Sequence, residues 1–246
     1  MTRIAIIAAL EREIGPLVEG WAPKVLHEQG RELISYRNSE LIAIAGGIGR
    51  RQAEIAARAA VNEFQAQALI STGLGGAIIR SLKVGSVFIP NVIVDAATGT
   101  EYRCNASPGV VAGGILVSVP EIAGAESKQL LADRFHGLVV DMEAAAVARV
   151  AQEMKKGFFC VKAISDELDS RLPPMNRFVD EAGRFQTGKF LSWGAVHPEW
   201  WAATIRLARD SRRAAHALCD WLDKNLTASF VAPAVVTLDG ADFPKP

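Results

Sequence analysis

The sequence has little cysteine, no excess of either charge and no long apolar run, and each absence excludes a class of protein. Its three cysteines among 246 residues, Cys104, Cys160 and Cys219, are far apart and form no CxxC pair. Neither a disulfide framework nor a zinc site is therefore expected. The 27 basic and 27 acidic side chains cancel to a net charge of zero, which argues against nucleic acid as a partner.

No apolar stretch approaches the ~18 residues that a membrane-spanning helix needs. The N-terminal apolar stretch, residues 4–10, is short and runs directly into Glu11, Arg12 and Glu13. This favours a buried strand over a signal peptide. We therefore expect a cytoplasmic protein that has no membrane span.

Short β-branched runs alternate with longer amphipathic segments, a pattern typical of an α/β fold with a largely parallel or mixed sheet. We expect one domain over residues 1–226 and a C-terminal tail or surface arm over 227–246. Predicted strands cover residues 4–8, 41–45, 69–71, 86–94, 115–119, 138–140 and 158–164. Predicted helices cover residues 11–19, 50–64, 126–134, 142–155 and 199–224, and a long polar stretch covers 165–198.

Two predicted strands end in glycine-rich turns, GGIG at 46–49 and TGLGG at 72–76. Glycine allows a positive φ and a close approach of ligand to backbone, and a helix N-terminus after such a turn suits a phosphate or a polar sugar. Glycine also occurs in these loops only to make the turn. Neither turn is a GxGxxG or P-loop motif, so dinucleotide and nucleotide-triphosphate sites are not indicated.

Carboxylates follow three predicted strands. Glu13 lies just beyond the first strand, Asp141 and Glu143 follow residues 138–140, and Asp166 follows residues 158–164 next to Ser165. Each has a purely structural alternative, since Asp141 can cap a helix, Glu143 can sit in its first turn and Asp166 can form an Asx turn. Because parallel strands bring their carboxyl ends to one edge, the three together indicate a ligand site.

These residues resemble the nucleoside phosphorylase/nucleosidase superfamily. The resemblance rests on MTRIAIIAALEREI, GGIG, STGLGGAIIRSLKVGSVFI, VVDMEAAAVARVA and VKAISDELD, in order over residues 1 to about 169. Within the superfamily it is strongest to 5′-methylthioadenosine/S-adenosylhomocysteine nucleosidases. The segment VSVPEIAGAESKQLLADRFHGLVVDMEAAAVA, with LPP and LARDSRRA further on, is similar to the hopanoid-associated nucleoside phosphorylases.

The resemblance implies a twisted mixed sheet flanked by helices and cleavage of the N-glycosidic bond of an adenine nucleoside. It implies that Asp166, beside Ser165, binds the base edge and gives a proton to N7. It implies that Glu143 holds the ribose hydroxyls, that Met142 packs under the sugar, and that Glu13 orients or deprotonates the attacking water. Further substrate-binding positions implied are Gly47, Gly73, Leu74 and Ile122.

The sequence departs from the family pattern at pocket positions. Leu74 stands where nucleosidases usually have serine, and Ser71 and Leu74 stand where hexameric phosphorylases have the arginine and serine that hold phosphate. Lys162 replaces an arginine before AISD, and Ile122 or a neighbour replaces the base-stacking phenylalanine. These departures leave the 5′ substituent of the substrate open.

The resemblance implies no metal and no organic cofactor, with water preferred as the acceptor. The alternative is a phosphorylase that uses inorganic phosphate as co-substrate, with Arg12 and Arg50 as its phosphate ligands. A second alternative is a catalytically reduced nucleoside-binding protein that keeps the fold. Relatives imply a homo-oligomer, a dimer or a hexamer, with a small purine nucleoside as the ligand.

Overall fold

The strands of the computed structural model, which describes residues 3–107 and 109–226, form two mixed sheets. In the first sheet β1 pairs in parallel with β4 and β5, and β5 pairs in parallel with β12. An antiparallel hairpin, β2 and β3, extends this sheet beyond β4. Its strand order is β12 (Gly157–Cys160), β5 (Ala68–Ser71), β1 (Ile4–Ala8), β4 (Leu41–Ala45), β3 (Arg31–Arg37) and β2 (Ala22–Glu28).

The second sheet continues from the first through a single residue, Val161, which joins β12 to β13. Within it β6 pairs in parallel with β13 and antiparallel with β11, so the sheet is also mixed. Its strand order is β7 (Val87–Phe88), β13 (Lys162–Asp166), β6 (Leu74–Ala77), β11 (Gly137–Asp141), β10 (Ile115–Ser118), β8 (Val92–Asp95) and β9 (Glu101–Arg103).

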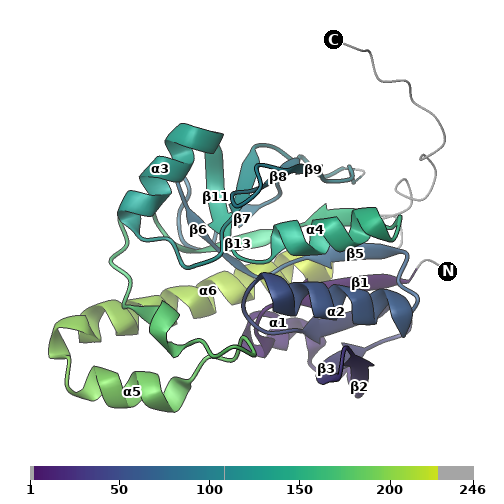
Figure 1. Ribbon diagram of the computed structural model, residues 1–246, viewed down its shortest axis with the longest axis horizontal. Helices are drawn as coiled ribbons and strands as arrows, with labels where there is room; N and C mark the ends of the chain where they lie inside the picture. The colour runs from purple at the N-terminus through teal and green to yellow at the C-terminus, as the bar shows by residue number, and fades with distance from the viewer. Residues whose placement is uncertain (1–2, 108, 227–246) are drawn as a thin grey trace, which may run out of the picture.

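Helices cover the sheets on both sides (Figure 1). Helices α2 (Arg50–Asn62) and α4 (Ala144–Glu153) pack against each other and against the first sheet, and α4 also reaches the second. Both present buried alanines, which let the helices approach the strands closely. Helix α1 (Glu11–Val18) packs against the long α6 (Trp201–Asn225), which also contacts β13, while α3 (Ala125–Phe135) covers β10 and β11.

The predicted mixed α/β fold is confirmed, but strand boundaries differ where the sequence carries a weak signal. The single strand predicted over 86–94 is two strands, β7 and β8, with Pro90 between them, because proline cannot donate to the hydrogen-bond ladder. The strand predicted over 158–164 divides at Val161 between the two sheets. The second glycine turn is largely a strand, β6.

Besides β6, three strands and the helices of the long polar stretch were not predicted. The hairpin β2–β3 is mostly exposed, so its hydrophobic pattern is faint, and β9 has three residues. The long polar stretch contains a turn of 3-10 helix, η1 (Met175–Phe178), and helix α5 (Thr187–Ala195). A second 3-10 turn, η2 (Pro198–Trp200), lies where the helix over 199–224 is predicted to begin. Figure 1 shows α5 and the adjoining part of α6 extending beyond the sheets. We call residues 171–200, which include η1, α5 and η2, the extension.

Aromatic side chains hold this extension together. The ring of Phe190 lies 5.2 Å from that of Phe178, 5.4 Å from that of Phe185 and 6.1 Å from that of Trp193, measured between centroids. Such aromatic pairs contribute beyond the area that they bury. The extension therefore has a small core of its own.

Within residues 3–107 and 109–226, no helix is both long and apolar enough to cross a membrane. The tail predicted over 227–246 lies outside the described residues.

Candidate active site

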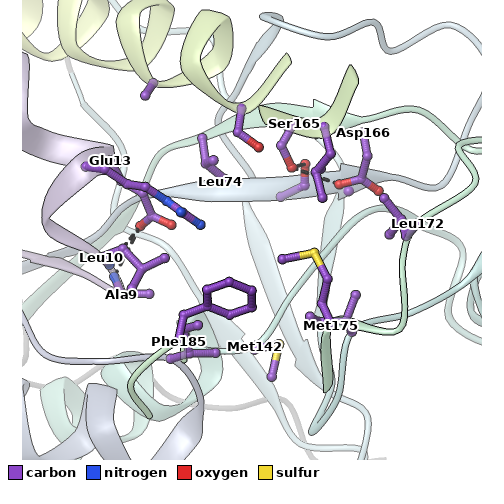
Figure 2. A pocket seen from close by; sticks show the side chains of 18 of the residues that line it. Ala9, Leu10, Glu13, Leu74, Met142, Ser165, Asp166, Leu172, Met175 and Phe185 are labelled. Atoms are coloured by element: carbon purple, nitrogen blue, oxygen red, sulfur yellow. Dashed lines mark hydrogen bonds between the residues drawn. The ribbon is translucent and has the colours of Figure 1, made fainter. Parts of the chain in front are cut away.

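A cavity of about 950 Å³ lies where the carboxyl ends of β1, β11 and β13 meet α1 and α6. Glu13 and Asp166 stand on opposite sides of it, with Met142, Met175 and Phe185 between them (Figure 2). This volume is in the range of small-molecule sites in proteins. The strand ends on which the sequence placed its carboxylates therefore enclose one ligand-sized space.

Glu13 is positioned by the start of α1. It is the third residue of the helix, and its Oε2 accepts the backbone N–H groups of Ala9 and Leu10, each at 3.3 Å. This is one half of a capping box, in which a glutamate folds back on the helix start. The side chain is buried, and burial raises the pKa of the Glu13 carboxyl although the charge of Lys162 opposes this.

Glu143 lies at the end of β11, immediately before α4, but does not interact with that helix through its side chain. Its Oε1 accepts the backbone N–H of Gly49 at 2.8 Å, at the start of α2. Asp141 caps α4 instead, since its Oδ2 accepts the N–H of Ala144 at 2.9 Å. The predicted cap is thus confirmed, and the Glu143 side chain, which lines the cavity, is held by the GGIG turn instead.

Lys162 is a buried cation that interacts with the carboxylates of Asp141 and Glu143. Its Nζ lies 2.9 Å from Asp141 Oδ2 and donates to the carbonyl oxygen of Thr72 at 2.9 Å. Burial alone would lower the pKa of Lys162, but Asp141 and Glu143 raise it above its ordinary value. Lys162 therefore supplies a fixed positive charge that offsets part of the desolvation of the carboxylates.

Burial raises the pKa of Glu143 to about 7 from an ordinary value of 4.5, against the opposing charge of Lys162. Between these pH values the unfolded chain releases a proton that the folded chain keeps, so stability falls as pH rises through this window. Glu143→Gln, whose amide oxygen still accepts from Gly49, is expected to be more stable than the parent at pH 8. The gain should be on the order of 2 kcal/mol, or roughly 5 °C in Tm.

Thermal denaturation of both proteins at pH 5 and pH 8 measures this effect. The difference in Tm should be near zero at pH 5 and positive at pH 8. An equal difference at both pH values would show that burial of this carboxyl does not set the pH dependence.

Ser165 and Asp166 end β13 at an irregularity in the strand. The register against β6 shifts between Ile164 and Asp166, and such bulges re-aim side chains next to active sites. Ser165 Oγ donates to Asp166 Oδ1 at 2.8 Å, and Lys128 Nζ from α3 donates to Asp166 Oδ2 at 2.5 Å. Both oxygens of the Asp166 carboxylate are thereby held in place.

The structure brings most of the predicted site residues to this cavity. Those that line it are Arg12, Glu13, Leu74, Ile122, Met142, Glu143, Ser165 and Asp166.

Three predicted residues do not line the cavity. Gly73 lies behind Glu13, where a Cβ would come within 2.6 Å of Glu13 Oε2, and its φ of +118° also favours glycine. Gly47 faces the 181–183 loop, where a Cβ would lie 3.1 Å from the carbonyl oxygen of Ala182. Arg50 forms an ion pair with the buried Asp95.

Other lining residues come from parts of the chain to which the sequence analysis gave no role. Lys128 is buried on α3, in a helix whose pattern does not indicate a site. One wall is apolar and comes from the extension, and another comes from α6 and carries arginines. The first contains Leu172, Met175, Phe185, Phe190 and Leu191, and the second contains Leu207, Ala208, Arg209 and Arg212.

Comparison with protein families identifies the fold and the ancestry of this site. The model of the phosphorylase superfamily matches residues 3–112 and 107–187, which include Glu13, Glu143 and Asp166. The chain belongs to the phosphorylase superfamily. The residues at the cavity's acidic side all lie inside the matched segments, whereas α6 lies outside them.

Two curated members similar to the chain are nucleosidases. The aminodeoxyfutalosine nucleosidase of Campylobacter jejuni is 26% identical over 68% of this chain and 86% of its own length. The 5′-methylthioadenosine/S-adenosylhomocysteine nucleosidase of Bacillus velezensis is 28% identical over 79% of this chain and 94% of its own.

Solved structures of superfamily members share the fold. The 5′-methylthioadenosine/S-adenosylhomocysteine nucleosidase of Neisseria meningitidis, in complex with methylthio-immucillin-A, matches with a TM-score of 0.68 at 19% identity. That match covers 90% of this chain and 97% of the other. The S-adenosylhomocysteine nucleosidase of Streptococcus pyogenes, in complex with 5-methylthiotubericidin, matches with a TM-score of 0.64 at 22% identity, over 92% and 98%.

Proposed function

We propose that this protein is a purine nucleosidase that hydrolyses the N-glycosidic bond of an adenine nucleoside. The observation that carries the proposal is the enclosure of Glu13, Glu143 and Asp166 in one cavity, inside the segments that match the phosphorylase superfamily. The similar members named above are nucleosidases. The cavity's acidic lining suits a reaction whose transition state carries positive charge on the sugar.

The base binds at Asp166 in this proposal. Cleavage of the C1′–N9 bond leaves its electron pair on the purine, so a proton delivered to N7 stabilises the leaving group. General-acid help of this kind contributes about 10²–10⁴ in rate. Ser165 and Lys128 hold the carboxylate through one hydrogen bond each, which supports a fixed orientation against the base edge.

The ribose binds between Met142 and Glu143, and water is activated by Glu13. Glu143 keeps one oxygen on the N–H of Gly49 and can accept ribose hydroxyls with its remaining lone pairs. Glu13, whose pKa is raised by burial, is suited to take a proton from water, because a general base works best with a pKa near the working pH. No metal or organic cofactor takes part in these steps.

Water rather than phosphate is the proposed acceptor. Of the two arginines predicted as phosphate ligands, Arg12 lines the cavity and Arg50 is paired with Asp95. The N-terminus of α2, which the GGIG turn would offer to a phosphate, has the Glu143 carboxylate on its first N–H. A phosphorylase remains the alternative, and the position of Arg12 beside Glu13 is the observation that favours it.

The apolar wall of the extension faces the remainder of the nucleoside. Its side chains, Phe185, Phe190 and Leu191 among them, offer no hydrogen bonds, so they favour an apolar 5′ substituent over a free hydroxyl. We also propose that the protein works as a homo-oligomer, as the resemblance implies, and in the cytoplasm, as its unpaired cysteines favour.

Incubation of the full chain with methylthioadenosine, adenosylhomocysteine and adenosine, each with and without phosphate, tests the function. Adenine release that does not depend on phosphate, with free sugar as the second product, is expected. Formation of a sugar 1-phosphate would establish the phosphorylase alternative. Thermal stabilisation by adenine without turnover of any nucleoside would show a binding protein and overturn the proposal.

A further inference from the structure

Lys128 is a buried cation that the proposed reaction uses only to hold the Asp166 carboxylate. Its side chain is 1% exposed, although it extends from α3 to the edge of the cavity. Its Nζ donates to Asp166 Oδ2 at 2.5 Å and to the carbonyl oxygen of Glu167 at 3.0 Å. A lysine is seldom buried without a specific partner, because the charge loses its hydration.

The backbone of β6 leaves room for this pair. Gly76 lies against it, and a Cβ at this position would come within 2.8 Å of Asp166 Oδ2 and 3.1 Å of Lys128 Nζ. Any side chain larger than hydrogen would therefore displace the ammonium or the carboxylate. The contact is thus built from three elements, α3, β6 and β13.

Both hydrogen bonds at the Asp166 side chain are donated to it, so its neighbours can supply the proton that N7 takes up. Lys128 and Ser165 both donate to the carboxylate. A proton that Asp166 gives to a leaving base can therefore be replaced along a hydrogen bond from one of these donors. Lys128 is the cationic N–H donor in contact with the carboxylate.

We propose that Lys128 is a positioning residue that fixes Asp166 against the base and supplies, through it, the proton that N7 takes up. The proposal rests on the nucleosidase function above. As the C1′–N9 bond breaks, its electron pair moves onto the purine. A proton passes from Lys128 Nζ to Asp166 and from Asp166 to N7. Water adds hydroxide to C1′ and gives its proton to Glu13. Glu13 then releases that proton to solvent, and Lys128 regains one from solvent through Asp166, so the protons balance.

The test compares two leaving groups in Lys128→Met, which keeps the length of the side chain and removes its charge. Turnover of an adenine nucleoside should fall by about 100-fold, the lower range of general-acid effects. Turnover of the corresponding p-nitrophenyl riboside, whose leaving group departs without protonation, should stay within about threefold, since no acid catalysis is lost there. A merely structural role would lower both rates equally.

Lys83→Met is the matched control. Lys83 pairs with Glu167, the next residue after Asp166, but its side chain is 63% exposed, so its loss should leave both rates unchanged. Equal losses on the two substrates in Lys128→Met, or no loss on the nucleoside, would overturn the proposal. If the unmodified enzyme released base from no nucleoside, the proposed function would fail instead.

A double variant gives a second, independent measurement on the nucleoside alone. If Lys128 acts through Asp166, adding Lys128→Met to Asp166→Asn should cause no further loss of turnover, because residues that act as a unit are not additive. A further loss comparable to that of the single Lys128 variant would show that Lys128 acts on another group and would refute the relay.

Discussion

Asp166→Asn is expected to lower kcat for adenine release by about 10³-fold, the middle of the range for loss of a general acid. The asparagine has no acidic proton for N7, and its single amide oxygen can replace only one of the two acceptors that Ser165 and Lys128 use. The fold should persist, because Asp166 lies at the end of β13 and borders the cavity rather than the core. Adenine release and thermal denaturation measure the two effects.

Asp169→Asn is the control for this variant. Asp169 pairs with Arg80 on the surface, and its side chain is 63% exposed. Its replacement removes a carboxylate three residues away and should not change turnover. If Asp166→Asn lost less than about tenfold, well below general-acid effects, Asp166 would not be the acid.

Glu13→Gln is expected to produce a loss on the order of 10³-fold, because a neutral amide cannot take the proton of the attacking water. The glutamine oxygen can still accept the N–H groups of Ala9 and Leu10, so the start of α1 should be preserved. Release of adenine under saturating substrate isolates the effect on kcat from any effect on KM.

Glu11→Gln serves as the companion variant. Glu11 is in the same turn of α1 but is exposed and accepts the hydroxyl of Tyr36, away from the lining of the cavity. It should keep full activity. Comparable losses of turnover in the two variants would show that the overall negative charge at the start of α1, and not Glu13 itself, supports catalysis. Unchanged turnover in Glu13→Gln would show that another group activates the water.

The acidic half of the site could be predicted because its residues follow strands. Glu13, Glu143 and Asp166 are distant in sequence, but each comes just after an apolar run, and the rule that such strand ends share one edge brings them together. The same local reading could not assign Glu143 its partner. Local pattern predicted that Glu143 lies in the first turn of α4, whereas its side chain accepts the N–H of Gly49, the residue just before α2.

The hairpin β2–β3 shows that hydrophobic pattern alone does not reveal a strand whose side chains are mostly exposed. Only Leu26 is buried in β2, so the strand has almost no apolar face. A signal was nevertheless available, since Gly30 precedes an alternation in which Leu33 and Ser35 are buried. Both Gln29 and Gly30 have positive φ, as a two-residue hairpin turn requires.

Lys128 and the apolar wall could not be predicted from local pattern at all. A lysine on an amphipathic helix is ordinarily solvated, and only the packing of α3 against the second sheet buries this one. Likewise, the polar appearance of residues 165–198 concealed a segment whose few aromatics pack on one another. Tertiary contact decides both, and sequence spacing does not record it.

The separate core of the extension has a consequence for how specificity can change. Phe178, Phe190 and Trp193 pack among themselves, whereas the carboxylates are anchored to strands and to the starts of helices. The apolar side chains of residues 184–200 can therefore vary in bulk without moving the bond-breaking groups, whereas residues 181–183 contact the GGIG turn and the start of α2. The substrate that the cavity accepts can in this way change through substitutions in the apolar wall, while the strands and helix starts keep the three carboxylates in place.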